Sequence, residues 1–136
     1  MNSDSNPLLI KVGLPAYDRI LPEHIAPAVE IVLKRCREVL ARVEESTETS
    51  WSALMDPMEE VDRLFEYGWS PIGHLLSVAN SEPLREAHDA AMPKIVEFSL
   101  QLRQSEALYK KLVALRDSLQ WSGFTGAQQR IITRMI

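Results

Sequence analysis

The stretch Trp-Ser-Pro-Ile-Gly-His-Leu-Leu-Ser-Val-Ala-Asn-Ser-Glu-Pro-Leu-Arg, residues 69–85, contains two signals for the start of a helix. Ser70-Pro71 and Ser81-Glu82-Pro83 each place a hydroxyl at an N-cap and a proline in the first turn, where its missing N–H costs no hydrogen bond. They predict a short helix over residues 71–79 and a longer one from Pro83 to about Arg103. The stretch should therefore be the hinge between two helical halves.

The residues before this hinge predict two long helices, over 22–45 and 51–68. Their apolar side chains recur at three- and four-residue steps, which is the pattern of a helix with one buried face. The first helix has two possible starts: either Pro22 begins it and Pro27 bends its second turn, or a turn comes first and Pro27 begins it. Pro57 indicates either a kink or two successive helices, and Gly68 is expected to be a C-cap.

The residues after the hinge continue the helical pattern. Pro93 should bend the helix over 83–103, Ser105-Glu106 begins another helix, and Thr125 caps a last one. The chain has only five glycines in 136 residues, which favours helices over a turn-rich β-fold. We therefore predict an all-α fold: an antiparallel helical bundle of about five to six helices with an extended N-terminal arm.

We expect two parts, an extended arm over residues 1–21 and a helical domain over residues 22–136. The arm is punctuated by prolines, and it is apolar enough to lie across a surface, either of this chain or of a part beyond it. The last helix ends on a rising apolar face at Met135-Ile136, without a C-cap. We therefore expect residue 136 not to be the natural end, and the chain to be the front of a longer protein.

Composition and charge exclude several classes of partner. The net charge is −4, divided into −6 over residues 1–68 and +2 over residues 69–136, so no basic footprint for a nucleic acid is present. No apolar run approaches the ~20 residues of a membrane span, so no membrane partner is predicted. Cys36 is the only cysteine and no signal peptide is visible, which predicts a cytoplasmic protein.

The sequence contains no constellation that predicts a catalytic, cofactor-binding or metal-binding site. His24, His74 and His88 do not fall at the three- or four-residue spacing that brings two ligands to one helix face, and His-Glu-x-x-His is absent. We interpret His74 as a structural residue, partly buried and bonded to backbone, and Cys36 as a buried, inert thiol. Neighbouring carboxylates such as Glu59 and Glu60 should point in different directions.

Several stretches together carry a family resemblance: Asn6-Pro7-Leu8-Leu9, Ile20-Leu21-Pro22-Glu23-His24-Ile25, Cys36-Arg37-Glu38, Ser70-Pro71-Ile72-Gly73-His74-Leu75, Asn80-Ser81, Leu84-Arg85-Glu86-Ala87 and Ala127-Gln128. In them the chain resembles the N-terminal helical region of the thimet oligopeptidase family of zinc peptidases. The resemblance covers almost the whole chain.

The resemblance implies a non-catalytic N-terminal domain of a zinc-dependent oligopeptidase, forming part of the wall of its substrate channel. Members of the family hydrolyse short peptides with a zinc ion held by a His-Glu-x-x-His helix and a later glutamate. None of these residues maps onto residues 1–136, so this chain alone should be inactive and hold no zinc. The implied partners are the remainder of the same polypeptide, which carries the zinc and the catalytic domain, and short peptide substrates.

The alternative is a stand-alone α-helical interaction module. It would dock a partner through the acidic region at 44–66 or through the apolar arm.

Overall fold

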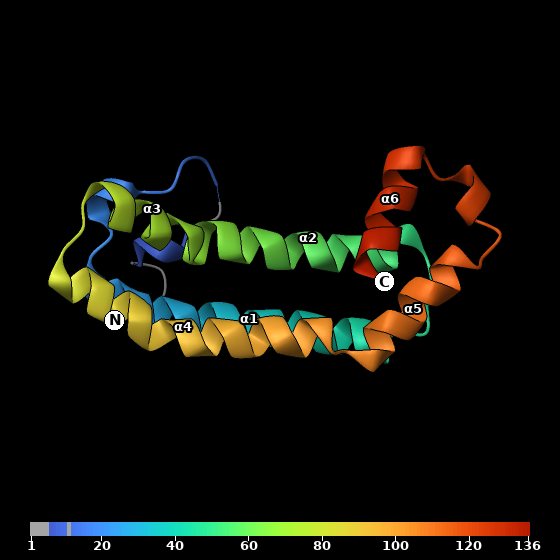
Figure 1. Cartoon of the computed structure of the whole chain (residues 1–136), viewed down its shortest axis with the longest axis horizontal. Coiled ribbons are helices and arrows are strands. Elements are labelled where there is room, and N and C mark those ends of the chain that lie inside the picture. The colour runs from blue at the N-terminus through green and yellow to red at the C-terminus, as the bar shows by residue number, and fades with distance from the viewer. Residues whose placement is uncertain (1–5, 11) are drawn as a thin grey trace.

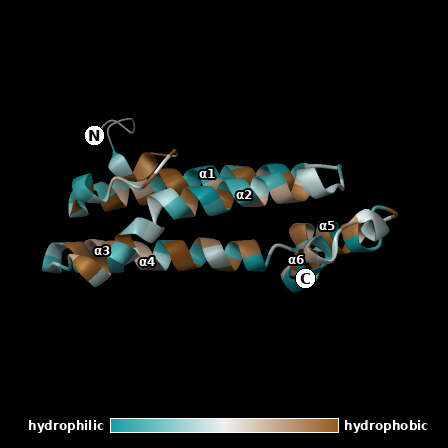
Figure 2. Cartoon of the chain, turned by 90° about the horizontal axis from the view of Figure 1, so that it is seen from above, coloured by the Kyte–Doolittle hydropathy of each residue, from teal (hydrophilic) through white to brown (hydrophobic). Residues whose placement is uncertain are grey.

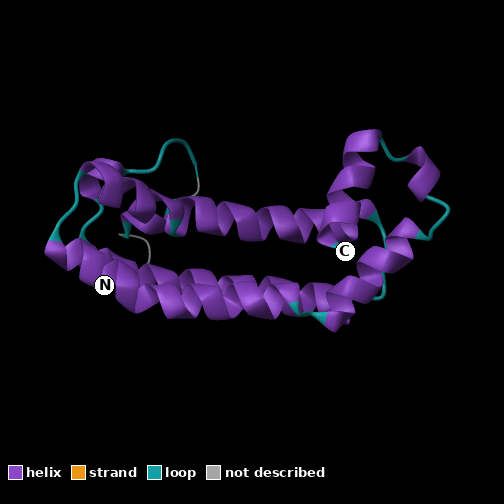
Figure 3. Ribbon diagram, viewed as in Figure 1, coloured by secondary structure: helices purple, strands orange, loops and turns teal. Residues whose placement is uncertain are grey.

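The computed structural model describes residues 6–10 and 12–136, and its regular elements are all helical (Figure 1, Figure 3). The six α-helices are α1 (Ile25–Glu45), α2 (Trp51–Gly68), α3 (Ser70–Val78), α4 (Glu82–Arg103), α5 (Glu106–Arg116) and α6 (Gly126–Met135). Short 3-10 turns lie at Pro7–Leu9, Tyr17–Arg19, Pro22–His24 and Trp121–Gly123. The predicted all-α class is confirmed. No helix in the described part of the chain is long and apolar enough to cross a membrane.

The three long helices lie side by side, and α1 is the one that the other two share (Figure 1). α2 runs antiparallel to α1 and α4 runs in the same direction as α1. α3 folds back at one end of the bundle, while α5 and α6 pack together at the other end. The brown apolar residues of Figure 2 follow stripes along the long helices rather than covering them.

The core is built around the apolar stripe of α1. Its buried side chains recur at three- and four-residue steps and none is more than 2% exposed: Ile25, Ala28, Val29, Val32, Leu33, Cys36, Val39, Leu40 and Val43. Residues of α2 and α4 cover this stripe from two sides, with Phe98 of α4 the largest fully buried side chain. Burying each such side chain contributes roughly 1.5–3 kcal/mol, so the stripe accounts for much of the driving force for folding.

Four helices begin with a hydroxyl N-cap. The hydroxyls of Ser50, Ser81, Ser105 and Thr125 accept hydrogen bonds from the backbone N–H three residues later. Ser70 was predicted as a cap as well, but this was wrong. It is already the first residue of α3, and the N-cap is Trp69, whose side chain cannot accept a hydrogen bond from the first turn.

The prolines resolve two ambiguities. Pro22 opens a 3-10 turn that runs directly into α1 at Ile25, and this places Pro27 within the first turn of α1, where no N–H is needed. Pro57 lies inside one uninterrupted α2, so the alternative of two successive helices was wrong. α4 likewise continues through Pro93.

The N-terminal arm docks on the bundle of its own chain. Leu8 is 1% exposed and packs in the core with Ile20. The side chain of Asn6 accepts from the Leu8 N–H at 3.0 Å and donates to the His24 carbonyl oxygen at 3.0 Å. The first five residues of the arm lie outside the described residues. The proposed division at residue 22 stays a prediction, because the described arm shares its core with the helices.

Gly68 has a different role from the C-cap that the sequence suggested. It is the last residue of α2 and lies outside the left-handed region, where Gly13 is the only described glycine. A Cβ atom at Gly68 would lie 2.5 Å from Cγ2 of Val32. The position therefore needs glycine because α2 and α1 approach one another closely there.

We expect Gly68→Ala to lower the free energy of unfolding by about 1–3 kcal/mol, because the added methyl group overpacks the α1–α2 contact. Urea denaturation measures the change. In a Val32→Ala background the same substitution should cost less by about 1 kcal/mol, because the opposing methyl group is gone. The matched control is Gly73→Ala, where a Cβ meets nothing within 4 Å. There the greater helix propensity of alanine should stabilise the chain by up to about 1 kcal/mol, and a loss at both glycines would contradict the close-approach explanation.

Asn6→Ala should lower the free energy of unfolding by about 1–3 kcal/mol, because it leaves the buried Leu8 N–H and His24 carbonyl without their partner. Asn80→Ala is the control, since Asn80 is exposed and only accepts from Arg85 at 3.1 Å. That change should cost less than about 0.5 kcal/mol. Equal costs in the same denaturation experiment would show that the arm does not contribute to the stability of the bundle.

Candidate functional site

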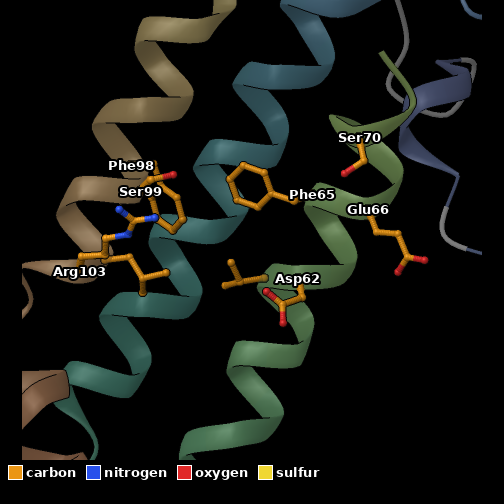
Figure 4. Close-up of a pocket in the computed structure, with 9 residues that line it drawn as sticks. Asp62, Phe65, Glu66, Ser70, Phe98, Ser99 and Arg103 are labelled. Carbon is orange, nitrogen blue, oxygen red and sulfur yellow. The ribbon is translucent and has the colours of Figure 1, made fainter. Parts of the chain in front are cut away.

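A groove between α2 and α4 is the candidate site (Figure 4). Its volume is about 290 Å³, and it is lined by Val61, Asp62, Phe65, Glu66, Ser70, Phe98, Ser99, Leu102 and Arg103. The rings of Phe65 and Phe98 stack across it with centroids 5.9 Å apart, and the ribbon of α1 runs behind them. The groove exists because α2 and α4 both pack on α1, while they approach each other mainly through this ring pair.

The two walls of the groove differ in charge. Asp62 and Glu66 stand one helical turn apart on the α2 wall, and Arg103 stands on the α4 wall. Within the part of the chain that the structure describes, none of these three side chains makes an ion pair. The groove therefore offers an apolar floor between one acidic and one basic edge.

The ion pairs on the outer sides of α2 and α4 point away from the groove. Glu60 of α2 pairs with Arg42 of α1 at 3.3 Å, and Lys94 of α4 pairs with Glu30 of α1 at 3.5 Å. Glu60 thus faces α1 while Asp62 faces the groove, as expected for neighbouring carboxylates on a helix. A second, acidic hollow is lined by Asp56, Glu59, Glu60, Arg63 and Leu64 on α2, within the acidic region of the sequence.

The groove continues toward the far end of the bundle. A further hollow shares Leu102 and Arg103 with it and is also lined by Met58, Ser105, Leu108, Tyr109, Leu112, Arg134, Met135 and Ile136. The apolar residues of α5 and α6 thus extend the floor of the groove beyond α4.

The structure contradicts the environment expected for His74 and shows that a different histidine is buried. His74 was predicted to be partly buried and bonded to backbone, but it is exposed and its ring packs against Tyr17 of the arm, with centroids 4.9 Å apart. His24 is the buried one, 8% exposed, and its Nδ1 accepts the backbone N–H of Leu21 at 2.9 Å. The sequence favoured His74 because it lies between two capped helices, but that position turned out to face outward.

The three histidines do not come together. His88 stacks on Trp69 with ring centroids 4.9 Å apart and contacts Asp89, whereas the ring of His24 bonds to Leu21. Across residues 6–10 and 12–136, no three histidine, cysteine or acidic side chains gather where they could hold a metal ion. The donor groups of this part of the chain therefore do not fit a zinc site.

The surroundings of the single cysteine make its thiol unreactive. Cys36 is 0% exposed within the α1 stripe. Burial raises the pKa of its thiol from the ordinary 9.0 to about 12; the negative charge of Glu60 acts in the same direction, and Arg37 acts against both. Because the thiolate is the nucleophile, the neutral thiol is inert at physiological pH.

The chain matches the family model of the neurolysin/thimet oligopeptidase N-terminal domain over residues 29–136. It belongs to the neurolysin/thimet oligopeptidase family. The match begins inside α1 and includes the whole of both groove walls.

Curated relatives of the chain are oligopeptidases A from bacteria and plants. The chain is 38% identical over 130 residues to oligopeptidase A of Haemophilus influenzae, which is 96% of this chain and 19% of that protein. It is 40% identical over 129 residues to oligopeptidase A of Escherichia coli, 94% of this chain and 19% of that protein. A probable cytosolic oligopeptidase A of Arabidopsis thaliana is 32% identical over 132 residues, 97% of this chain and 19% of that protein. The chain thus spans about a fifth of the length of these relatives.

The motifs that carry the family resemblance have structural roles here. Ile72 is fully buried at the start of α3, Ser81 caps α4, and Asn6 ties the arm to the turn before α1. Gln128 completes a capping box, because its side chain accepts from the N–H of Thr125 at 2.8 Å. The residues that carry the family resemblance thus stabilise the fold of this domain.

The raised pKa of Cys36 predicts a pH dependence of stability. Above pH 9 the unfolded chain loses the thiol proton while the folded chain keeps it, so the unfolded state binds fewer protons and folding becomes less favourable. Relative to Cys36→Ala, the free energy of unfolding should be flat below pH 9 and then fall by about 1.4 kcal/mol per pH unit as the pH rises toward about 12. Urea denaturation of both chains between pH 7 and 10.5 measures the difference, and parallel curves above pH 9 would mean that the folded thiol ionises normally.

Proposed function

We propose that this chain is the non-catalytic N-terminal helical domain of a zinc-dependent oligopeptidase and forms part of the wall of its substrate channel. The family match over residues 29–136, in a chain that spans 19% of its bacterial relatives, carries the proposal. A domain of this size leaves the zinc ligands and the general base to the remainder of the polypeptide. The substrates would be short, flexible peptides that pass beside this domain.

The physical character of the domain supports a steric role. Three long helices with a continuous core form a stiff wall, since the apolar stripe of α1 is buried along the whole length of the helix. The cysteine is neutral, and the ring of each histidine is engaged by the arm, a turn or Trp69. A rigid, chemically inert wall would admit unstructured peptides and exclude folded proteins by size.

We also propose a cytoplasmic location. The lone thiol suits a reducing compartment, and one plant relative is described as cytosolic. Another plant relative is described as chloroplastic or mitochondrial, so the family is not restricted to one compartment.

The second candidate is an α-helical interaction module. Val12 and Leu14 of the arm favour this function, because they are 83% and 88% exposed. The arm is held between them by the Tyr67 hydroxyl, which donates to the Gly13 carbonyl oxygen at 2.6 Å. The acidic hollow at Asp56 and Glu59 is a second possible contact surface.

A comparison of the 136-residue chain with the complete coding sequence tests the proposal. We expect the coding sequence to continue to a His-Glu-x-x-His, and the full polypeptide to hydrolyse a quenched fluorescent peptide until a chelator removes zinc. The purified 136-residue chain should show no hydrolysis and no zinc binding by mass spectrometry. Chelator-sensitive hydrolysis by the short chain would refute the non-catalytic role, and a coding sequence without the zinc motif would favour the interaction module.

A further inference from the structure

The groove is the empty corner of a four-helix arrangement. In a four-helix bundle each long helix packs on two long neighbours. Here α1 has two, but α2 and α4 each pack extensively only on α1, and the Phe65–Phe98 stack joins their facing sides. The vacant corner lies diagonally opposite α1, above the groove.

The dimensions of the corner suit a helix of about two turns. The lining residues run from Met58 to Glu66 on α2 and from Phe98 to Arg103 on α4, which are lengths of about 12 and 8 Å at the rise of an α-helix. Both walls lie on uninterrupted helices, so the groove is preformed.

The outer wall of α4 carries an apolar stripe that the core does not use. Met92, Val96 and Leu100 follow at four-residue steps and are 40%, 47% and 46% exposed. The other exposed side of α4 carries polar residues, among them Glu97 and Gln101. The apolar surface of α4 is therefore wider than α1 can cover. The excess lies beside the groove, because Val96 comes three residues before Ser99 and seven before Arg103, which both line it.

The charges at the edges of the groove determine which charged side chains a helix bound there (the occupant) would carry. Asp62 and Glu66 would attract lysine or arginine on the flank that faces α2. Arg103, joined by Arg134 of α6 at the end of the groove, would attract a carboxylate on the other flank. The fitting partner is an amphipathic helix with a basic edge, an apolar stripe and an acidic edge.

A second copy of the chain does not supply such a helix. The apolar stripes of α1, α2 and α5 are buried in their own bundle. The last helix, α6, exposes Ile131 and Met135 but carries no acidic side chain to meet Arg103. The relatives, in contrast, contain about four times as much further polypeptide. We propose that the groove between α2 and α4 binds an amphipathic helix from the remainder of the same polypeptide, a proposal that rests on the proposed function.

Cysteine labelling in the 136-residue chain and in the full polypeptide tests this proposal, because the buried Cys36 gives no background. The groove positions are Asp62→Cys, on the α2 wall, and Val96→Cys, on the apolar stripe beside the α4 wall. Glu97→Cys and Gln101→Cys are matched controls on the polar side of α4. All four positions are exposed in this domain. Maleimide labelling, read site by site by peptide mass spectrometry, should be at least about tenfold slower in the full polypeptide at the groove positions and within about threefold at the controls.

The charge pattern is tested in the full polypeptide by reversal. Asp62→Lys together with Glu66→Lys should restore labelling of Val96→Cys by about tenfold, because the basic edge of the occupant would be repelled. Glu97→Lys, on the polar side, should leave that rate unchanged. No effect of the double reversal would overturn the assigned orientation of the occupant.

Other outcomes separate the two proposals. A full polypeptide that hydrolyses peptide but labels equally fast at the groove would overturn the docking proposal and leave the proposed function standing. Slow labelling that affects the controls equally would overturn it as well. Protection that appears in the 136-residue chain and grows with its concentration would identify a second copy as the occupant. A coding sequence without further polypeptide would refute both proposals.

Discussion

The nine buried side chains along one face of α1 lose contact with water only because two different helices cover them. α2 covers one side and α4 the other, and the arm closes the end of the stripe with Leu8. This shared burial sets the positions of the other elements. It brings α2 so close that residue 68 must be glycine, and it separates α2 from α4 by the width of two stacked phenylalanine rings. The groove is thus a direct geometric result of how α1 is buried.

The sequence predicted the helices well because their signals are local. Hydroxyl caps, prolines and three- and four-residue apolar steps act within one or two turns, and they placed α2 at its observed bounds and capped α4 at Ser81. Features that depend on contacts between two segments far apart in the chain could not be predicted from the sequence. The burial of His24 needs Asn6 and Leu21 around one turn, and Gly68 is explained only by Val32 on another helix.

The groove could not be predicted either, because its existence depends on how closely α2 and α4 approach each other in the folded chain. One sequence signal pointed toward it. Met92, Val96 and Leu100 form a second apolar stripe beside the core stripe of the same helix. A helix with more apolar surface than one neighbour can cover indicates a further neighbour. The expectation that the chain has no catalytic site came from the spacing of its histidines and acidic residues. It is part of the proposed non-catalytic role, and the comparison of the short and full chains tests both.

The central position of α1 also affects the order in which the protein folds during synthesis. Most of the contacts that bury its stripe come from α4 and from segments before it, so most of the bundle can form once α4 has left the ribosome. In the longer polypeptide that we propose, the phenylalanine floor and the outer stripe of α4 would then be exposed to water until the occupant is translated. At about 5–20 residues per second, this interval lasts seconds for each hundred residues that separate them. The groove would therefore be a temporary binding surface for chaperones in the young chain and an internal contact in the finished one.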